Sequence, residues 1–148
     1  MSRAGWIALA LVAGAGLPLQ AGINAALRKG IGSPLWASAI SFGVGTLVLL
    51  TLAAATRATV PSPAALGSLP AYAWVGGVIG AFYVTATIVL APRLGAAAFT
   101  ALVVGGQMAL ALALDQLGAL GFPQQSLSAG RLLGAGLLVA GVALIQRF

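Results

Sequence analysis

Two amide side chains near the N-terminus are the residues of this chain best suited to bind a polar molecule. In the segment GLPLQAGINAALR, Gln20 and Asn24 lie four positions apart, and this spacing places both side chains on one face of an α-helix. An amide donates and accepts hydrogen bonds but does not ionise. The pair therefore predicts a helix face that binds by hydrogen bonding rather than by charge.

Further residues could complete a substrate pocket around this face. Tyr83 and Thr87 are also four positions apart, Gln107 lies in a later apolar run, and Trp36 and Phe42 could supply an aromatic wall. Pro18 lies just before the amide pair, where it removes a helical hydrogen bond and bends the helix. We interpret Pro18 as a hinge and the other residues as substrate ligands.

Catalytic chemistry has almost no residues to use. The chain contains no His and no Cys, and Asp115 is its single carboxylate side chain. An acid pair, a metal cluster or a catalytic triad therefore cannot be assembled. We expect neither enzyme activity nor a cofactor or metal. Asp115 is expected to form an ion pair with Arg131 rather than to carry protons.

The composition indicates which solvent surrounds these residues. Of the 148 residues, 61% are hydrophobic and 5% are charged, whereas about a quarter of a soluble domain is charged. The net charge of +6 comes from basic residues at the ends of apolar runs, which is typical of membrane flanks. We therefore expect lipid, and no nucleic acid, as the partner of this surface.

Five apolar stretches are long enough to cross a bilayer core, which takes about 20 helical residues. They cover residues 4–27, 34–56, 71–91, 95–117 and 130–146. The runs are continuous rather than alternating, which favours helices over a β-barrel. The sequence thus predicts an all-α, multi-pass membrane protein with a single five-helix domain over residues 1–148. The segments RATVPSPAALGSLP and GFPQQSLSAGR are expected to be loops, and APRLG a tight turn.

The basic residues are almost evenly divided between the two sides of the membrane. With side A holding the N-terminus, Arg3, Arg57 and Arg131 lie on side A, and Arg28, Lys29, Arg93 and Arg147 on side B. A clear excess on one side normally fixes orientation. Two interpretations stay open: one orientation with side B inside, or dual topology in which copies insert both ways and pair antiparallel. In either case, the side-A loops should be the longer ones.

Most polar side chains of the apolar stretches lie in the side-B half of the predicted helices. They are Gln20, Asn24, Ser38, Ser41, Tyr83, Thr85, Thr87 and Thr100, while Gln107 lies near mid-membrane. Polar groups at this depth need partners, so we expect a polar pocket that opens toward side B. Two other interpretations stay open. Single hydroxyls could bond back to their own helix, and the amides could join helices to one another.

Small residues in the last apolar stretch predict a surface for close helix packing. Gly130, Gly134 and Gly141 leave room for a neighbouring backbone. We interpret them as a dimer interface, and packing within one chain explains the same spacing equally well.

Several segments together resemble a known family. They are GLPLQAGINAALR, SPLWASAISFGVGTLVL, GGVIGAFYVTATIVLAPRLGAAAFTALVVGGQ, DQLGALGF and GRLLGAGLLVAGVALI, and they resemble the YdcZ-like family of the drug/metabolite transporter superfamily. The resemblance implies a five-helix half-transporter in the bacterial plasma (inner) membrane. It also implies an antiparallel partner, either an identical chain or a paired homologue. Related small multidrug exporters use a membrane-embedded glutamate, and this chain has no acid at that depth.

The combined expectation is an antiparallel, dual-topology homodimer that transports a small organic solute by alternating access. The uncharged ligands favour a neutral, zwitterionic or amphipathic solute. The alternatives from other classes are a non-transporting membrane scaffold or assembly partner and a passive channel.

Overall fold

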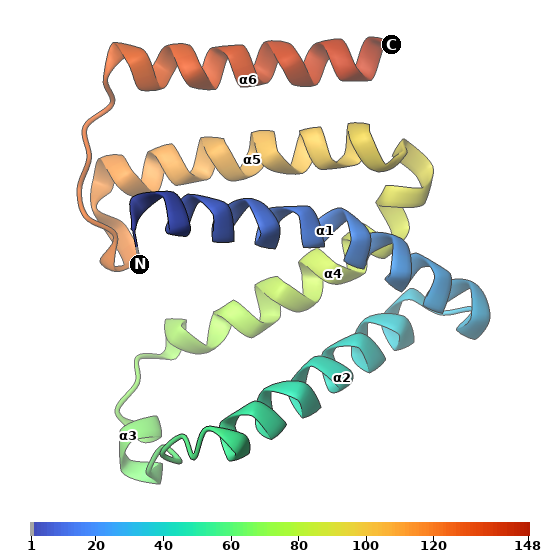
Figure 1. The fold of residues 1–148 in the computed structure, drawn as a ribbon, viewed down its shortest axis with the longest axis vertical. Helices are drawn as coiled ribbons and strands as arrows, with labels where there is room; N and C mark the ends of the chain where they lie inside the picture. Colours follow the sequence, from blue (N-terminus) through green and yellow to red (C-terminus); the bar gives the residue numbers. More distant parts are fainter. Residues whose placement is uncertain (1) are drawn as a thin grey trace. The chain divides into compact units, whose positions relative to one another are not determined.

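The computed structural model describes residues 2–148 as an all-helical protein (Figure 1). The long helices are α1 (Arg3–Ile31), α2 (Pro34–Ala55), α4 (Val75–Leu94), α5 (Ala96–Leu117) and α6 (Ala129–Arg147). The short ones are α3 (Pro63–Gly67), η1 (Ala71–Trp74) and η2 (Ala119–Gly121). Within the described residues, five helices are long and apolar enough to cross a membrane, the third of them joining η1 to α4. The all-α fold class with five membrane-spanning helices is therefore confirmed.

Local signals in the sequence account for where these helices begin and end. The hydroxyls of Ser2, Ser33 and Ser128 accept hydrogen bonds from the first turns of α1, α2 and α6, which is the usual role of serine at a helix start. Gly32 ends α1 with a φ of 83°, a left-handed conformation that glycine adopts without a steric penalty. Because of this late stop, α1 ends four residues beyond the predicted boundary at position 27.

Two connections differ from what the sequence predicted. The segment APRLG is not a turn of several residues, because α4 continues through Pro92 to Leu94 and Gly95 alone, with a φ of 82°, separates α4 from α5. The loop RATVPSPAALGSLP contains the short helix α3, which the Ser62 hydroxyl caps. Residues 56–70 and 118–128 form the two long connections. These are the side-A connections, so the longer loops lie where we expected them.

The chain divides into two compact units, Met1–Pro92 and Arg93–Phe148. Among the described residues of the first unit, buried ones occur only in the second half of α1, at the start of α2 and in the second half of α4. The cluster of Ala37, Val84 and Ile88 lies there, with Leu27 and Tyr83 packed against it. Figure 1 shows α1 and α2 diverging from the short connection at this end. The first unit is therefore packed at its side-B end and open toward side A.

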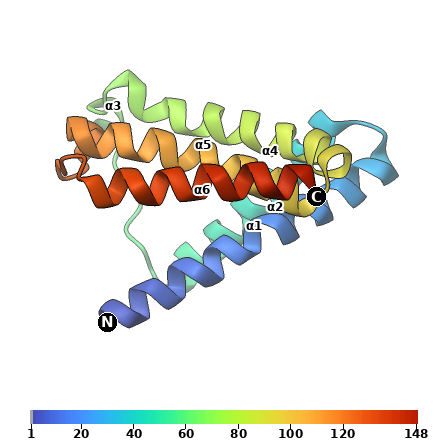
Figure 2. The same ribbon diagram turned by 90° about the horizontal axis from the view of Figure 1, so that it is seen from above.

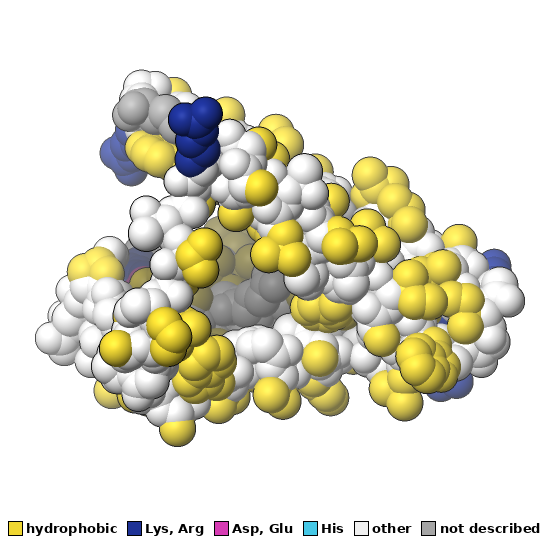
Figure 3. Space-filling model, turned by 90° about the horizontal axis from the view of Figure 1, so that it is seen from below, with side chains coloured by type: hydrophobic (Ala, Val, Ile, Leu, Met, Phe, Trp, Pro, Cys, Tyr) yellow, Lys and Arg dark blue, Asp and Glu magenta, His cyan; other side chains and the backbone are white. Residues whose placement is uncertain are grey.

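In the second unit, α5 and α6 run alongside each other (Figure 2). Gly105 of α5 faces α6, because a Cβ there would lie in van der Waals contact with Val142 and Leu138, 3.7 Å and 3.8 Å from their methyl groups. None of the described residues of α6 is buried. Figure 3 shows one face of the whole molecule, on which most of the coloured side chains are hydrophobic and the Lys and Arg side chains lie near the edges. This distribution suits a surface that contacts lipid or another apolar helix.

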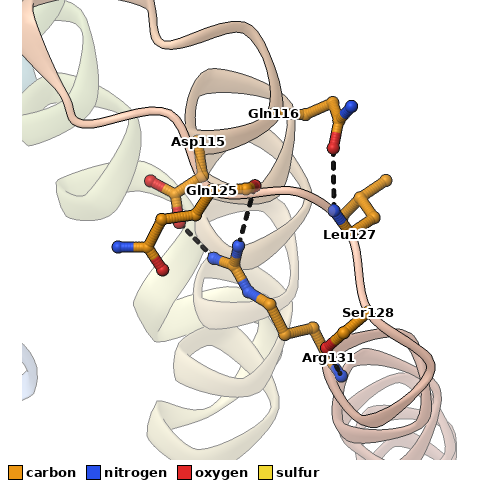
Figure 4. A network of polar contacts seen from close by, with 6 residues as sticks. All are labelled: Asp115, Gln116, Gln125, Leu127, Ser128 and Arg131. Carbon is orange, nitrogen blue, oxygen red and sulfur yellow. Dashed lines mark hydrogen bonds and ion pairs between the residues drawn. The ribbon is translucent and has the colours of Figure 1, made fainter.

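The connection between α5 and α6 is held by a network of polar contacts (Figure 4). The Arg131 guanidinium forms an ion pair with the Asp115 carboxylate and donates to the Gln125 carbonyl at 3.1 Å. The Gln125 N–H donates to the Asp115 carbonyl at 2.7 Å. The Gln116 side-chain oxygen accepts from the Leu127 N–H at 2.8 Å. The two residues of the ion pair therefore hold α5 and α6 together and also bind the backbone of the loop between them.

Removing this ion pair should destabilise the second unit. Asp115→Asn is expected to cost about 1 kcal/mol of folding free energy, as for a partly exposed pair. Asp115 lies at the C-terminal end of α5 and Arg131 in the first turn of α6. Each charge is therefore at the helix end where its interaction with the helix dipole is unfavourable. Exchanging the two residues keeps an ion pair and puts each charge at the helix end that favours it, so the exchanged variant should recover the whole loss. Thermal unfolding of the purified variants in one detergent measures both effects, and an unchanged midpoint for Asp115→Asn would contradict them.

Candidate functional site

A hollow of about 240 Å³ lies between α1, α2 and α4 in the first unit. Its lining consists of Gln20 from α1, Ser41, Phe42, Gly45, Thr46 and Leu49 from α2, and Val84 from α4. The α2 residues recur every three or four positions, so they share one helix face. None of these described lining residues is charged. The hollow can thus accept a small molecule through two hydroxyls, one amide and an apolar wall.

Phe42 forms the aromatic part of this wall. Its ring lies over Gly80 of α4, because a Cβ at Gly80 would be 3.5 Å from the Phe42 Cζ atom. A single Cβ at position 80 would be in ordinary van der Waals contact with the ring, so only a side chain longer than that of alanine would push the ring away from α4. The small residue at position 80 therefore lets the ring of Phe42 lie against α4.

Asn24 lies beyond Gln20 along α1 and is buried, with 4% of its surface exposed. Its Nδ2 atom has no hydrogen-bond partner among the described residues. A buried amide without a partner costs free energy, and native proteins pair the great majority of such groups. Asn24 is therefore the strongest candidate for a side chain that pairs with a polar group of a bound molecule.

Three other polar residues at this depth, Ser38, Thr85 and Thr87, already have partners. The Ser38 and Thr85 hydroxyls lie 2.9 Å apart and join α2 to α4. Each also lies within hydrogen-bond distance of a carbonyl of its own helix. The Thr87 hydroxyl donates to the Val84 carbonyl at 2.8 Å. This bond follows the pattern in which a threonine bonds back to its own helix, and Thr87 is not part of the lining.

The remaining predicted ligands lie apart from the hollow or at its edge. Tyr83 is half-buried against the apolar cluster of the first unit. Trp36 is 66% exposed. Gln107 is exposed on α5, which belongs to the second unit. Pro18 is half-buried within α1, which continues as a helix on both sides of it.

The three glycines of α6 have open space around them. In the described part of the chain, a Cβ at Gly130, Gly134 or Gly141 would meet no heavy atom within 4 Å. Close packing against α5 therefore does not account for these residues, in contrast to Gly105. That these glycines form a dimer interface stays a prediction.

The position of the hollow corrects the expected direction of the pocket. On α1, Gln20 precedes the buried Asn24, and on α2 the lining residues follow the buried Ala37. Both observations place the hollow closer to side A than the packed cluster is, so the hollow does not open toward side B. The physical reason is that small alanines and paired hydroxyls let the three helices close at the side-B end. Polar residues there satisfy one another instead of lining an opening.

Sequence reasoning missed most of the residues that line the hollow. Ser41 was noted for its depth alone, and Gly45, Thr46, Leu49 and Val84 were not considered. The sequence does contain a signal for the helix face that α2 contributes. Every fourth residue along it is small or apolar, namely the hydroxyl-bearing Ser41, then Gly45, then Leu49. That stripe resembles ordinary membrane-helix packing unless a facing amide such as Gln20 is known to be near it.

Comparison with known proteins gives one result. The family model described as "Putative inner membrane exporter, YdcZ" matches residues 5–144. Neither the curated proteins nor the solved structures contain a match. The matched range begins within α1 and ends within α6, so it includes all of α2, α4 and α5. The chain therefore belongs to the YdcZ family of the drug/metabolite transporter type and is a multi-pass protein of the bacterial inner membrane.

Proposed function

We propose that this protein carries a small organic solute across the inner membrane as an antiparallel homodimer that works by alternating access. The observation that carries the proposal is the uncharged hollow of the first unit, together with the buried Asn24 amide, which lies one helical turn beyond Gln20 of the lining and has an unpaired Nδ2 among the described residues. Export is the direction that the family description favours. Gln20 and Phe42 bind the solute in the hollow, and Asn24 pairs with its polar group.

The chemistry of the lining supports a neutral, zwitterionic or amphipathic solute. Gln20, Ser41 and Thr46 can donate and accept hydrogen bonds, whereas Phe42 and Leu49 provide apolar contact. A bare cation would lose its hydration here without gaining a counter-charge, at a cost of several kcal/mol. An amphipathic molecule can place its polar end at Asn24 and its apolar part against Phe42.

The antiparallel pair is supported by three features of the chain. The first unit leaves its hollow bounded by only three helices. The α6 glycines leave space for a helix of a second chain. The division of basic residues, three on side A and four on side B, permits insertion in both orientations. Two copies related by an axis in the membrane plane would form the inverted repeat common among transporters.

A flux screen in vesicles tests this proposal against its two rivals. The purified chain is reconstituted as the only protein, and a panel of neutral, zwitterionic and amphipathic solutes is tested. A transporter gives flux that saturates with solute concentration. A passive channel gives flux that rises linearly, and a scaffold gives none. Either of the last two results would overturn the proposal.

A further inference from the structure

A proline in α4 removes the helical hydrogen bond to the carbonyl of the most buried residue of this helix. Pro92 lies inside α4 and has no N–H, so the carbonyl four residues earlier loses its helical donor. That carbonyl belongs to Ile88, whose side chain is fully buried at 0% exposure. A freed carbonyl in an apolar setting is costly unless another donor reaches it.

Arg28 supplies that donor from a different helix. Its Nη1 atom donates to the Ile88 carbonyl at 3.3 Å, across 60 positions of sequence. The guanidinium is permanently charged, which strengthens the bond relative to one between neutral groups. The contact is therefore an electrostatically favourable tie between α1 and α4.

The tie lies at the end of the first unit where the three helices meet. Along α1, the order from side A is Gln20 in the hollow, then the buried Asn24, then Arg28. Along α4, Val84 of the hollow precedes Ile88. In both helices, the Arg28–Ile88 bond thus lies on the side-B side of the hollow and of Asn24.

We propose that Arg28 and Pro92 form a latch that keeps the side-B end of the hollow closed. Pro92 creates the free carbonyl, and Arg28 is the positioning residue that uses it to hold α4 against α1. An interhelical bond to a carbonyl freed by proline can open without breaking the regular bonding of α4. The consequence for transport rests on the proposed function: the latch must open for the solute to leave on side B.

A labelling experiment tests the latch without measuring transport. Ala25, on the buried face of α1 at 9% exposure, is replaced by cysteine in this naturally cysteine-free chain. The full-length protein in nanodiscs is then treated with a charged maleimide. Arg28→Gln should raise the labelling rate about tenfold, as expected for the loss of one charge-assisted hydrogen bond. Lys29→Gln is the matched control, because Lys29 is exposed in the same turn, and it should leave the rate unchanged.

The decisive arm is Pro92→Ala, which returns an N–H donor to the Ile88 carbonyl. In the Pro92→Ala background, Arg28→Gln should change labelling by less than about twofold, since the carbonyl no longer depends on Arg28. An equal rise in both backgrounds, or none in either, would overturn the latch. If Arg28→Gln does not fold, folding of the double variant supports the latch, and its failure to fold refutes it. If the effect of Arg28→Gln on labelling depends on Pro92 as expected but the protein shows no solute flux, the latch is supported and the proposed transport function is rejected.

Discussion

Replacing Asn24 with leucine is expected to reduce transport about a hundredfold while the chain still inserts and pairs. The Asn24 amide is buried and has an unpaired Nδ2 among the described residues. A polar group of the solute would therefore lose its partner, and such a loss costs about 2–3 kcal/mol. Leucine has a similar shape and is favoured in lipid, so the helix itself should be unharmed.

The measurement is the initial rate of solute flux in vesicles that contain equal amounts of folded protein. Thr51→Val is the matched control, because Thr51 is exposed on α2 and its hydroxyl bonds to its own helix at the Leu47 carbonyl. Gln20→Leu should have a smaller effect, since Gln20 is exposed at the edge of the hollow. Normal flux with Asn24→Leu would show that the amide is not a ligand. Loss of assembly would show that it joins helices instead.

Fixing the orientation of the chain is expected to abolish most of its activity. Replacing Ala58, Thr59 and Val60 with lysine raises the side-A count of basic residues from three to six, against four on side B. These positions lie in the exposed connection that follows α2, and the excess should drive insertion with side A inside. A population with one orientation cannot form antiparallel pairs. Each locked variant should therefore transport little by itself.

Co-expression with a chain locked in the other orientation should restore transport. Lysines at Ile31, Leu94 and Phe148, which are exposed at the side-B end of their helices, supply the opposite lock. Glutamine at the same positions is the control for the substitutions themselves. A tag at the C-terminus should be detected on both sides of the membrane for the wild type and on one side for each lock. Full transport by a single locked chain would contradict the antiparallel pair.

The helices were predictable because their signals are local. Runs of apolar residues, Ser33 followed by Pro34, and Gly32 after the last turn of α1 each act within a few positions. The ion pair between Asp115 and Arg131 was also foreseeable, since the two residues lie at the facing ends of consecutive predicted helices and are joined by a single loop.

The arrangement of the site was less predictable, because it depends on how whole helices rotate and approach. Depth in the membrane suggested Thr87 as a ligand, but its hydroxyl bonds within α4. Pro92 was interpreted as part of a turn, because proline usually ends a helix. Its tolerance inside α4 depends on Arg28, whose acceptor is a backbone carbonyl. A carbonyl occurs at every position, so no residue type in the sequence marks it.

Solute counterflow by the wild-type chain, reconstituted as the only protein in the vesicles, tests the central claim most directly. Vesicles are loaded with the unlabelled solute that the flux screen identifies, and entry of labelled solute from outside is followed over time. An alternating-access homodimer predicts saturable entry that is accelerated by the internal solute and is lost in Asn24→Leu. Entry that ignores the internal solute, or entry that Asn24→Leu leaves intact, would contradict a carrier built around this hollow.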